Sequence, residues 1–584
     1  MTKVLQRAVF LTTAILMLSV ASGRAQLPLD PMQQAWVDQT LAQMSLDEKL
    51  GQLLFPATQG RFMNLESDAF REIQDNIQKF HVGGYIIRGG DPAITYLMVS
   101  RMQGLARNPL LVTADLEGGP GFQFAGGTRF PRGMAIGATG NPQYAYDAAS
   151  FTAKEARAMG IRVNFYPVVD VNNNPANPII NIRSFGENAL KVSAFGEAYI
   201  KGTQDAGVIA TAKHFPGHGD TTTDSHLALP VIPYDRARLN AIELPPFEGA
   251  LKAGVGSVMT SHIYLSQFEK TAGVPASLSS AITTDLLRKE MGFQELVFTD
   301  SLAMHAITEN FGAAQAPLKA IEAGADVALE PQDVPGALMA LKAAVAKGEL
   351  TEELVNESVR RVLAAKAWAA LNNDRLPPFN QIDTAVGGPA AQQKSQEIIE
   401  HALTLVKDDA NALPLKLRDD EQVLLVNFVD SGDQENASDS GLTFRAEFVK
   451  RHPKTFFVSV TPGTSSSEAN LIRDLAASQK TVVVSCSIRL ASYKGALGLT
   501  DNQQNLLRAL APHKGPIVFV LFGSPYLLNY IPELPSYALA YEFYPGAEAA
   551  MARAVFGEIP FVGRLPVTVG DYPQGFRLEK PDRP

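Results

Sequence analysis

Eight short apolar runs, separated by helix-like segments, constrain the fold of this chain more than any other feature. The runs are GQLLFP (51–56), GGYII (83–87), LLVTAD (110–115), NFYPVVD (164–170), IATAKHF (209–215), SVMTSHI (257–263), LVFTD (296–300) and ADVALEP (325–331). Runs this short and this continuously apolar are typical of parallel strands that are buried on both faces. Eight strand–helix units predict an α/β fold of the (β/α)8 TIM-like barrel type, with an open doubly wound sheet as the alternative.

The segments between the runs carry helix signals, and the composition changes after the last of them. In MSLDEKLGQLL, for example, Ser45 and Glu48 have the spacing of a capping box. We expect the barrel to span residues 30–372. Residues 373–394 are rich in Pro, Gly and Asn and are predicted to be a linker. Apolar strands then alternate with helical segments again, which predicts a smaller C-terminal α/β domain over residues 395–584.

The N-terminus and the overall charge limit where the chain works and what it binds. Residues 1–25 read as a signal peptide: basic residues precede a thirteen-residue apolar run, and small residues follow. That run is shorter than the about 20 residues that span a bilayer, so we expect an exported, periplasmic or extracellular protein whose mature chain is not inserted in a membrane. The net charge of −9, without clustered Lys or Arg, argues against a nucleic-acid partner. Cys486 is the only cysteine and is predicted to be a buried free thiol.

Polar residues stand at the carboxyl ends of the predicted strands. They are Arg88, Asp115, Asp170, Lys213, His214, His262, Asp300 and Glu330. In a TIM barrel these ends converge on one face, which is where such barrels carry their chemistry. The pattern therefore predicts the position of a site as well as the fold.

Asp300 is the first candidate for chemistry at this face. It ends a buried strand directly before a turn into a helix, so it is also a candidate helix cap. A carboxylate held among cations such as Arg88 and Lys213 stays ionised and is able to attack an electrophilic carbon. Retaining glycosidases pair such a nucleophile with a second group that transfers a proton.

The loop KHFPGHGDTTTDSHLALP (213–230) is where that second group is expected. One interpretation is a zinc site formed by His214, Asp220 and His226, although their spacing matches no compact zinc motif. A second is a purely structural polar loop. The third takes Asp224 and His226 as a dyad, in which the carboxylate orients the imidazole and stabilises its protonated form. Such an imidazole donates and accepts protons near neutral pH.

Several motifs resemble glycoside hydrolase family 3, and the loop resembles the β-N-acetylglucosaminidase branch of that family. The motifs are MSLDEKLGQL, DLEGG, NFYPVVDVNNNPANPIINIRSFG, AKHFPGHGDTTTDSHLALP, PASLSSAITTDLLRKEMGFQELVFTDSLAM and GRLPVTVG. The resemblance is strong over about residues 40–370 and weaker over 395–570, where it implies the family's C-terminal α/β sandwich. It implies an exported enzyme that releases terminal β-linked N-acetylglucosamine with retention, from cell-wall muropeptides or chito-oligosaccharides, without a cofactor or a metal.

The resemblance also implies roles for individual residues. Asp300 would be the nucleophile that forms a glycosyl-enzyme, His226 the general acid/base and Asp224 its partner. Four further residues would bind the hydroxyls of the sugar at the cleavage site: Asp115, Arg183, Lys213 and His214. His218 matches the motif as well, and we expect it to shape the loop.

One departure from the branch concerns the segment after DLEGG. Where the branch commonly has R-V-x-R-F, this chain reads PGFQF, with Pro120 and Gln123 in place of the two arginines. An amide does not replace a guanidinium fork, and Arg132 is the nearby candidate to compensate. Two alternative functions therefore stay open at this stage, namely phosphorolysis at the same site and a catalytically weakened sugar-binding protein.

Overall fold

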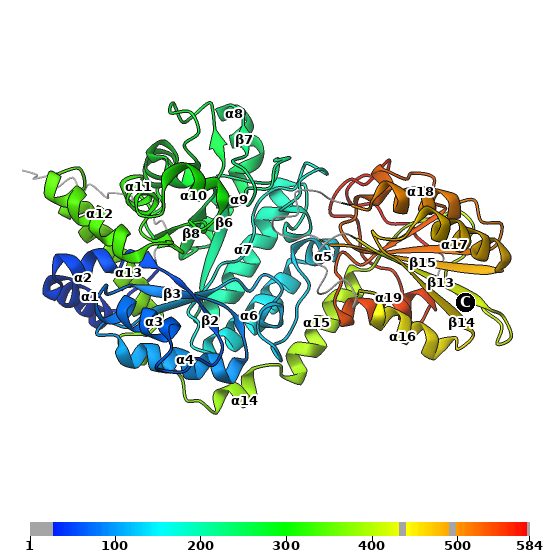
Figure 1. Ribbon diagram of the computed structural model, residues 1–584, viewed down its shortest axis with the longest axis horizontal. Helices are drawn as coiled ribbons and strands as arrows, with labels where there is room; N and C mark the ends of the chain where they lie inside the picture. The colour runs from blue at the N-terminus through cyan, green and yellow to red at the C-terminus, as the bar shows by residue number, and fades with distance from the viewer. Residues whose placement is uncertain (1–26, 431–439, 490–497, 581–584) are drawn as a thin grey trace, which may run out of the picture.

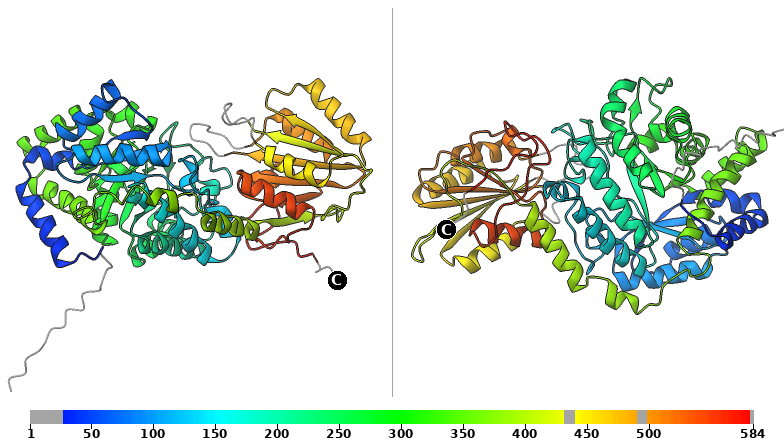
Figure 2. Two further views of the ribbon diagram at one scale, coloured as in Figure 1. Left: turned by 90° about the horizontal axis from the view of Figure 1, so that it is seen from below. Right: turned by 180° about the vertical axis from the view of Figure 1, so that it is seen from behind.

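The computed structural model describes residues 27–430, 440–489 and 498–580. The predicted signal peptide lies outside these residues. The chain forms two bodies side by side, a barrel coloured blue to green and a layered α/β body coloured yellow to red (Figures 1 and 2). None of the helices in the described ranges has the length and apolar character needed to cross a membrane.

The first body is a ring of short parallel strands. Its strands are β1 (Leu54–Phe55), β2 (Ala57–Gly60), β3 (Gly84–Gly90), β4 (Leu111–Ala114), β5 (Val163–Asn164), β6 (Ile209–Phe215), β8 (Ser257–Thr260), β10 (Leu296–Thr299) and β11 (Ala328–Leu329). The helices of this body are α1 (Pro31–Gln43), α2 (Leu46–Gly51), α3 (Asp68–Gln78), α4 (Pro92–Leu105), α5 (Gly133–Ala138), α6 (Pro142–Ala158), α7 (Ala189–Asp205), α8 (Arg236–Arg238), α9 (Pro245–Lys252), α10 (His305–Phe311), α11 (Gln315–Glu322), α12 (Val334–Lys347) and α13 (Glu352–Trp368). A small parallel pair, β7 (Val231–Ile232) with β9 (Tyr264–Leu265), stands apart from the ring.

Hydrogen bonds close this ring. Parallel pairing runs in the order β10-β8-β6-β5-β4-β3-β2, and β1 pairs with β11. β1 and β2 are one extended segment interrupted at Pro56, which has no N–H to donate. The remaining gap is bridged by Thr299, whose N–H donates to Val327 O at 3.0 Å, and by Ala328, whose N–H donates to Leu53 O at 2.9 Å. The predicted eight-stranded barrel is therefore confirmed, and the open-sheet alternative is wrong.

Two predicted strands differ from the observed ones in length. Gly51, in the first apolar run, ends α2 instead of starting a strand, and that helix begins with the predicted capping box of Ser45 and Glu48. Of the fourth run only Asn164 belongs to a strand, the two-residue β5, and one isolated bridge joins Val168 to Lys213. Pro167 explains the interruption, because proline cannot donate to the ladder.

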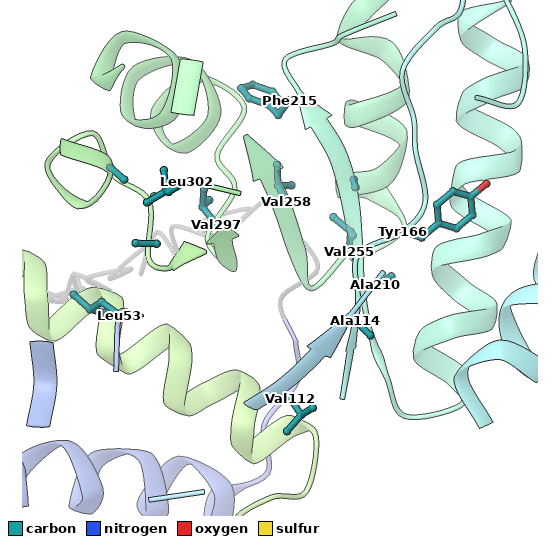
Figure 3. Packing of buried hydrophobic residues seen from close by; sticks show 14 of the residues in the cluster. Leu53, Val112, Ala114, Tyr166, Ala210, Phe215, Val255, Val258, Val297 and Leu302 are labelled. Carbon is teal, nitrogen blue, oxygen red and sulfur yellow. The ribbon is translucent and has the colours of Figure 1, made fainter. Parts of the chain in front are cut away.

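Side chains fill the inside of the barrel. Phe298 packs edge-on against Phe55 and Phe165, with ring centroids 5.7 and 5.1 Å apart. On the outer face of the strands a second apolar layer packs under the helices, and Val112, Val258 and Val297 belong to it (Figure 3). The barrel is therefore a solid core, and open space for chemistry lies at its ends.

The second body is a six-stranded sheet of order β12-β17-β16-β15-β13-β14. Its strands are β12 (Thr404–Asp408), β13 (Val423–Val429), β14 (Thr455–Val460), β15 (Thr481–Ile488), β16 (Ile517–Gly523) and β17 (Ser536–Leu539). Its helices are α16 (Leu442–Arg451), α17 (Ser466–Ser478), α18 (Asp501–Leu510) and α19 (Pro545–Val555), which lie on both faces of the sheet (Figure 1). β12 is antiparallel to β17, whereas the other neighbouring strands of this sheet are parallel. Cys486 is buried on β15, as expected, and burial raises the pKa of its thiol.

The predicted linker region contains helices, and the two bodies are in contact. α14 (Gln381–Ala385) and the start of α15 (Pro389–Ala402) fall within residues 373–394. α15 packs against α5 and α6 of the barrel and against α19 of the second body. A buried ion pair also joins the bodies: Arg132 Nε lies 2.6 Å from Glu542 Oε1.

A buried lysine in the barrel leads to a prediction about stability. Lys366 on α13 is fully buried and donates to Gln52 Oε1 at 2.5 Å. Burial, and to a smaller extent the charge of Arg375, lowers the pKa of Lys366 to about 7. Between pH 7 and pH 10 the unfolded chain still binds this proton and the folded chain does not. The free energy of unfolding therefore rises with pH across this window, by at most about 1.4 kcal/mol per pH unit.

Thermal unfolding of the wild type and of Lys366→Met, followed from pH 6.5 to 9.5, measures this effect. We expect the Tm of the wild type to rise relative to that of the variant as the pH increases. Lys191→Met, at an exposed position on α7, is the matched control, and its Tm should change with pH as the Tm of the wild type does. If the Tm of Lys366→Met also changes with pH as that of the wild type does, the prediction is wrong and Lys366 is charged in the folded protein.

Candidate active site

A cavity of about 520 Å³ opens at the carboxyl ends of the barrel strands. Among the residues that line it are Arg88, Asp115, Glu117, Phe122, Gln123, Arg132, Arg183, Lys213, His214, His218, Ser225, His226, Asp300, Ser301 and Glu330. Six of the seven residues that the sequence assigns to catalysis or substrate binding are in this lining. The seventh, Asp224, is buried directly behind His226.

The floor of the cavity is a chain of alternating charges centred on Lys213. Its ammonium lies 2.9 Å from Asp115 Oδ1 and 2.8 Å from Glu117 Oε1. Arg183 holds Glu117 from the other side through two hydrogen bonds, of 2.9 Å from Nε and 2.8 Å from Nη2. Burial opposes all of these charges, but the two cations hold the pKa of Glu117 well below its usual range. The floor is therefore ionised and rigid.

Arg88 extends this network from Asp115 to Glu330. It donates from Nη1 to Asp115 Oδ2 at 2.9 Å and from Nε to Glu330 Oε1 at 2.9 Å. Burial disfavours the charge of the guanidinium, but Asp115 and Glu330 raise the pKa of Arg88. Asp115 is thus placed between two cations, and its orientation is fixed.

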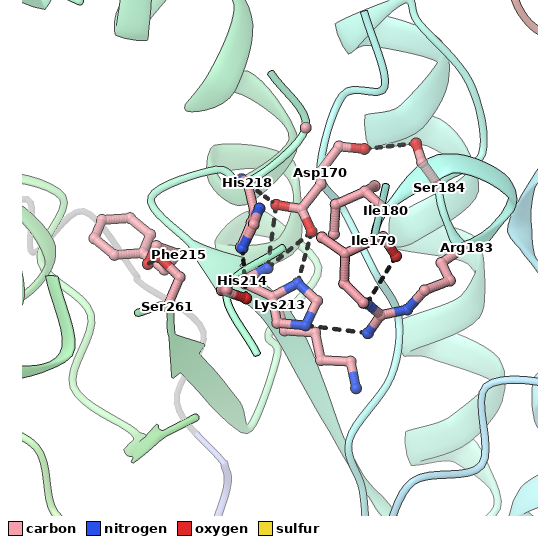
Figure 4. A network of polar contacts seen from close by, with 12 residues as sticks. Asp170, Ile179, Ile180, Arg183, Ser184, Lys213, His214, Phe215, His218 and Ser261 are labelled. Atoms are coloured by element: carbon pink, nitrogen blue, oxygen red, sulfur yellow. Dashed lines mark hydrogen bonds and ion pairs between the residues drawn. The ribbon is translucent and has the colours of Figure 1, made fainter. Parts of the chain in front are cut away.

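A second buried carboxylate, Asp170, orients His214 (Figure 4). Nδ1 of His214 lies 2.7 Å from Asp170 Oδ2, and the backbone N–H of His218 donates to Asp170 Oδ1 at 2.6 Å. Arg183 donates toward Nε2 of His214, at 3.2 Å. Because a guanidinium only donates, His214 is a neutral imidazole with its proton on Nδ1. Its ring is fixed at both nitrogens.

Asp300 stands at the end of β10 and faces the cavity. Its own Oδ1 accepts from Ser301 N at 2.8 Å, and α10 begins only at His305 with Met304 in the N-cap position. Asp300 is therefore not a helix cap, and that alternative is wrong. Burial disfavours its charge, but the positive charge that His214, His262 and His226 carry in the acid range where carboxylates titrate outweighs burial and lowers the pKa of Asp300. A carboxylate in this position stays ionised at any pH above its ordinary value of 3.8.

His262 fixes the backbone beside Asp300. Its Nε2 lies 2.8 Å from the carbonyl oxygen of Ser301, which only accepts, so Nε2 donates. Its Nδ1 lies 2.7 Å from Ser277 Oγ. Burial lowers the pKa of His262, in keeping with a neutral ring. The sequence places His262 at a strand end, but nothing in it indicates this contact.

The loop after β6 carries His226 into the cavity. Asp224 Oδ1 accepts from the backbone N–H of His226 at 2.9 Å and lies 2.8 Å from His226 Nδ1. The Asp224 side chain is fully buried, whereas that of His226 is 21% exposed. The pair therefore presents the other ring nitrogen, Nε2, toward the cavity, with a carboxylate behind the ring.

His218 and Asp220, two further polar residues of this loop, make contacts that fix its shape and its position. His218 contacts Thr221 Oγ1 and Ser225 Oγ, each at 3.0 Å, which is the loop-shaping role expected for it. Burial and the neighbouring His214 lower the pKa of His218 to about 4. Asp220 binds Tyr234 Oη at 2.5 Å and Arg238 Nη2 at 2.9 Å.

The zinc alternative required His214, Asp220 and His226 to converge on one ion. They do not, because each is held by a different partner: His214 by Asp170, His226 by Asp224, and Asp220 by Tyr234 and Arg238. Over the described ranges of the chain, no three His, Cys, Asp or Glu side chains are grouped so that they could hold a metal ion.

Pro120 and Gln123, the two departures from the branch motif, lie at a turn on the cavity wall. Pro120 starts a short 3-10 helix that ends at Phe122, and Gln123 also lines the cavity. Arg132 is on the same wall, but its guanidinium is already paired with Glu542 of the second domain. Arg132 therefore does not replace a lost arginine as a free cation.

Sequence reasoning missed Glu117, although it is central to the floor of the cavity. It stands two residues after Asp115, within the quoted motif DLEGG. The signal that could have found it is its position, because an acidic residue two places after Asp115 lies at the same carboxyl end of the barrel. Taken together, the site offers an ionised carboxylate and a carboxylate-supported imidazole in one polar cavity.

Comparison with known proteins agrees with this geometry. Residues 45–365 match the glycosyl hydrolase family 3 N-terminal domain, and residues 403–581 match the family's C-terminal domain. A β-N-acetylglucosaminidase/β-glucosidase of Cellulomonas fimi is 31% identical over 562 residues, which cover 93% of this chain and 97% of that relative.

Two solved structures are similar over nearly the whole chain. A family 3 β-N-acetylglucosaminidase from Paenibacillus sp. str. FPU-7 is 33% identical, with a TM-score of 0.79 over 90% of this chain and 99% of that one. The β-glucoside phosphorylase BglX is 25% identical, with a TM-score of 0.81 over 93% of this chain and 97% of that one. The chain therefore belongs to glycosyl hydrolase family 3, and it is a glycoside hydrolase built from the N-terminal and C-terminal domains of that family.

Proposed function

We propose that this enzyme is a retaining β-N-acetylhexosaminidase that releases terminal β-linked N-acetylglucosamine through a covalent intermediate on Asp300. One observation carries the proposal: an ionised carboxylate at the end of β10 and the Asp224–His226 pair on the loop after β6 line or support the same cavity. The names of the Cellulomonas and Paenibacillus relatives support N-acetylglucosamine as the sugar.

In the first step the Asp300 carboxylate attacks the anomeric carbon. The bond from that carbon to the glycosidic oxygen breaks, and the oxygen leaves with the bonding electron pair and the proton from His226 Nε2. Asp224 stabilises the positively charged imidazole until the proton has left. Because the pKa of Asp300 is low, the carboxylate is available without a separate base.

In the second step water attacks the same carbon from the face that the leaving group vacated. His226, now neutral, accepts a proton from this water, and the bond to Asp300 breaks. Two inversions give net retention of configuration. The enzyme returns to its starting protonation state, with the proton back on His226.

The charged floor of the cavity binds the sugar that is transferred. We assign Asp115 and Lys213 to its hydroxyl groups, because both line the cavity and are held rigid by their ion pairs. Hydrogen bonds to the sugar strengthen as its ring flattens toward an oxocarbenium-like transition state. Arg183 already hydrogen-bonds Glu117, Ile179 O and His214. We assign it mainly to positioning those groups.

We further propose that the enzyme acts outside the cytoplasm on cell-wall muropeptides or chito-oligosaccharides. The support is the leader-like sequence of residues 1–25. N-terminal sequencing of the protein recovered from the periplasm or the medium checks this, because cleavage after Ala25 leaves a chain that starts at Gln26. A full-length chain retained in the cytoplasm would contradict it.

Hydrolysis of 4-nitrophenyl β-glycosides of N-acetylglucosamine, glucose and xylose, side by side, tests the substrate class. We expect the highest kcat/KM on the N-acetylglucosaminide. Asp300→Asn should lower kcat by several orders of magnitude, because an amide is a poor nucleophile. Asp285→Asn, on an exposed carboxylate paired with Lys289, is the matched control and should behave as the wild type.

Three outcomes of this experiment contradict the proposal in different ways. Activity on the glucoside alone excludes N-acetylglucosaminides as the substrate class. A wild type as inactive as Asp300→Asn identifies a sugar-binding protein. Accumulation of the sugar phosphate when inorganic phosphate is added identifies phosphorolysis, the activity named for the structurally similar BglX.

The acid/base assignment leads to a second prediction, about leaving groups and pH. Replacing His226 by Ala should lower kcat/KM on a phenyl N-acetylglucosaminide by about 10²–10⁴-fold. It should lower kcat/KM far less on the 2,4-dinitrophenyl compound, whose leaving group needs no proton. In Asp224→Asn, kcat/KM on the phenyl compound should also fall, because the imidazole loses the carboxylate that orients it. The pH profile of kcat/KM is recorded for the wild type and both variants.

The acid limb serves as an internal check on the same profiles. Asp300 is ionised above its ordinary value of 3.8 because its pKa is lowered, so its titration does not produce an acid limb near neutral pH. His305→Ala, at a half-exposed histidine on α10, is the control for histidine removal. If His226→Ala loses equal activity on both aryl substrates, His226 is not the proton donor.

A further inference from the structure

An aromatic side chain stands at the mouth of the cavity, above the charged floor. Phe122 lines the cavity and is 37% exposed. The side chains of Lys213 and Glu117 on the floor are 3% and 7% exposed, and that of His226 is 21% exposed. Phe122 is therefore more exposed than Lys213, Glu117 and His226, although Arg88 of the floor reaches 38%. Its place in the lining puts the Phe122 ring within reach of a substrate that occupies the cavity.

The backbone around Phe122 is tightly fixed. Gly121 N donates to Thr128 O at 2.9 Å, and Phe130 N donates to Gly118 O at 2.9 Å. A Cβ on Gly121 would lie 2.3 Å from the carbonyl oxygen of Gly127, so this close approach requires glycine. The motif PGFQF therefore forms a turn that holds the Phe122 ring in one place.

Two arginines pack against the Phe122 ring. The guanidinium carbons of Arg129 and Arg132 lie 5.2 and 5.7 Å from its centroid. Arg129 also lies 5.8 Å from the ring of Tyr544, and within the described chain its Nε is buried without a hydrogen-bond partner. The Arg129 guanidinium therefore lies beside two aromatic rings, and the charge of Glu542 also acts on it. Phe122 is nevertheless 37% exposed and lines the cavity.

The second domain holds this arrangement in place. Glu542 receives Arg132 Nε at 2.6 Å and Nη2 at 3.3 Å, and its side chain is 1% exposed. Burial opposes the charge of Glu542, but Arg132 and Arg129 lower its pKa. Phe543 adds a further contact, 5.2 Å from the guanidinium carbon of Arg132. The backing of Phe122 thus depends on a carboxylate of the C-terminal domain.

We propose that Phe122 is the platform on which the second sugar ring of the substrate stacks, and that Glu542 positions this platform through Arg132. The inference rests on the proposed function. Apolar C–H faces of a pyranose ring fit the face of an aromatic ring, and aromatic side chains supply large contact areas in binding sites. Within the described part of the chain, Phe122 is the only Phe, Tyr or Trp that lines the cavity.

Two substrates that share the first sugar and differ in the leaving group test this proposal. One is di-N-acetylchitobiose, whose leaving group is a sugar ring. The other is β-N-acetylglucosaminyl azide, whose leaving group has no ring. In Phe122→Ala we expect the ratio of kcat/KM for the disaccharide to kcat/KM for the azide to fall by about 10-fold, because the second ring loses its stacking contact. Phe122→Trp should keep the ratio within about twofold, since it retains a ring face.

Two further variants separate this role from a structural one. Phe62→Ala removes a 72%-exposed phenylalanine that does not line the cavity, and it should leave the ratio unchanged. Glu542→Gln should lower the ratio in the same direction as Phe122→Ala, with a smaller effect. Kinetics on the azide show directly whether each variant keeps a folded site.

The outcomes distinguish this inference from the proposed function. If the wild type turns over neither compound, the proposed function fails. If the wild type is active and Phe122→Ala lowers kcat/KM equally for both substrates, or for neither, Phe122 is not a stacking platform, while the proposed function stands. A fall in the ratio for Phe62→Ala equal to that for Phe122→Ala would also overturn the platform.

Discussion

The site depends on one buried cation. The Lys213 ammonium, at the end of β6, holds Asp115 and Glu117, which follow β4. Every other floor residue attaches to one of these two carboxylates: Arg88 to Asp115, and Arg183 to Glu117. A buried charge is tolerated only when it is paired, so removing any one of them leaves another uncompensated. The rigidity of the floor is a consequence of this mutual dependence.

Above this floor the two groups that we propose to react with the substrate are held in different ways. Asp300 is fixed by its place at the end of a core strand and by His262, which binds the adjacent carbonyl. His226 is carried on a loop and is fixed mainly by Asp224. The proposed roles, a nucleophile on a strand end and a proton donor on a loop, suit a reaction in which the leaving group must enter and depart between two steps.

The parts of this site that could be predicted are those that follow from strand topology. Because all carboxyl ends of a parallel barrel face the same way, Asp115, Lys213 and Asp300 could be placed together from sequence alone. Contacts between distant loops could not. Glu117 and Arg183 are 66 residues apart, and Arg132 and Glu542 are 410 apart. No periodicity in the sequence indicates such pairs. The short length of β5 could not be predicted either, because it depends on the point at which Pro167 interrupts the hydrogen-bond ladder.

The central claim is that Asp300 becomes covalently linked to the sugar. Mass spectrometry of the enzyme after reaction with a 5-fluoro-N-acetylglucosaminyl fluoride tests it directly. The ring fluorine slows both steps, but the anomeric fluoride is a good leaving group that keeps the first step faster than the second, so the intermediate accumulates. The account predicts one added sugar per chain, on the proteolytic peptide that contains Asp300. A label on any other residue, or an unlabelled enzyme that is still turning over the reagent, would contradict it.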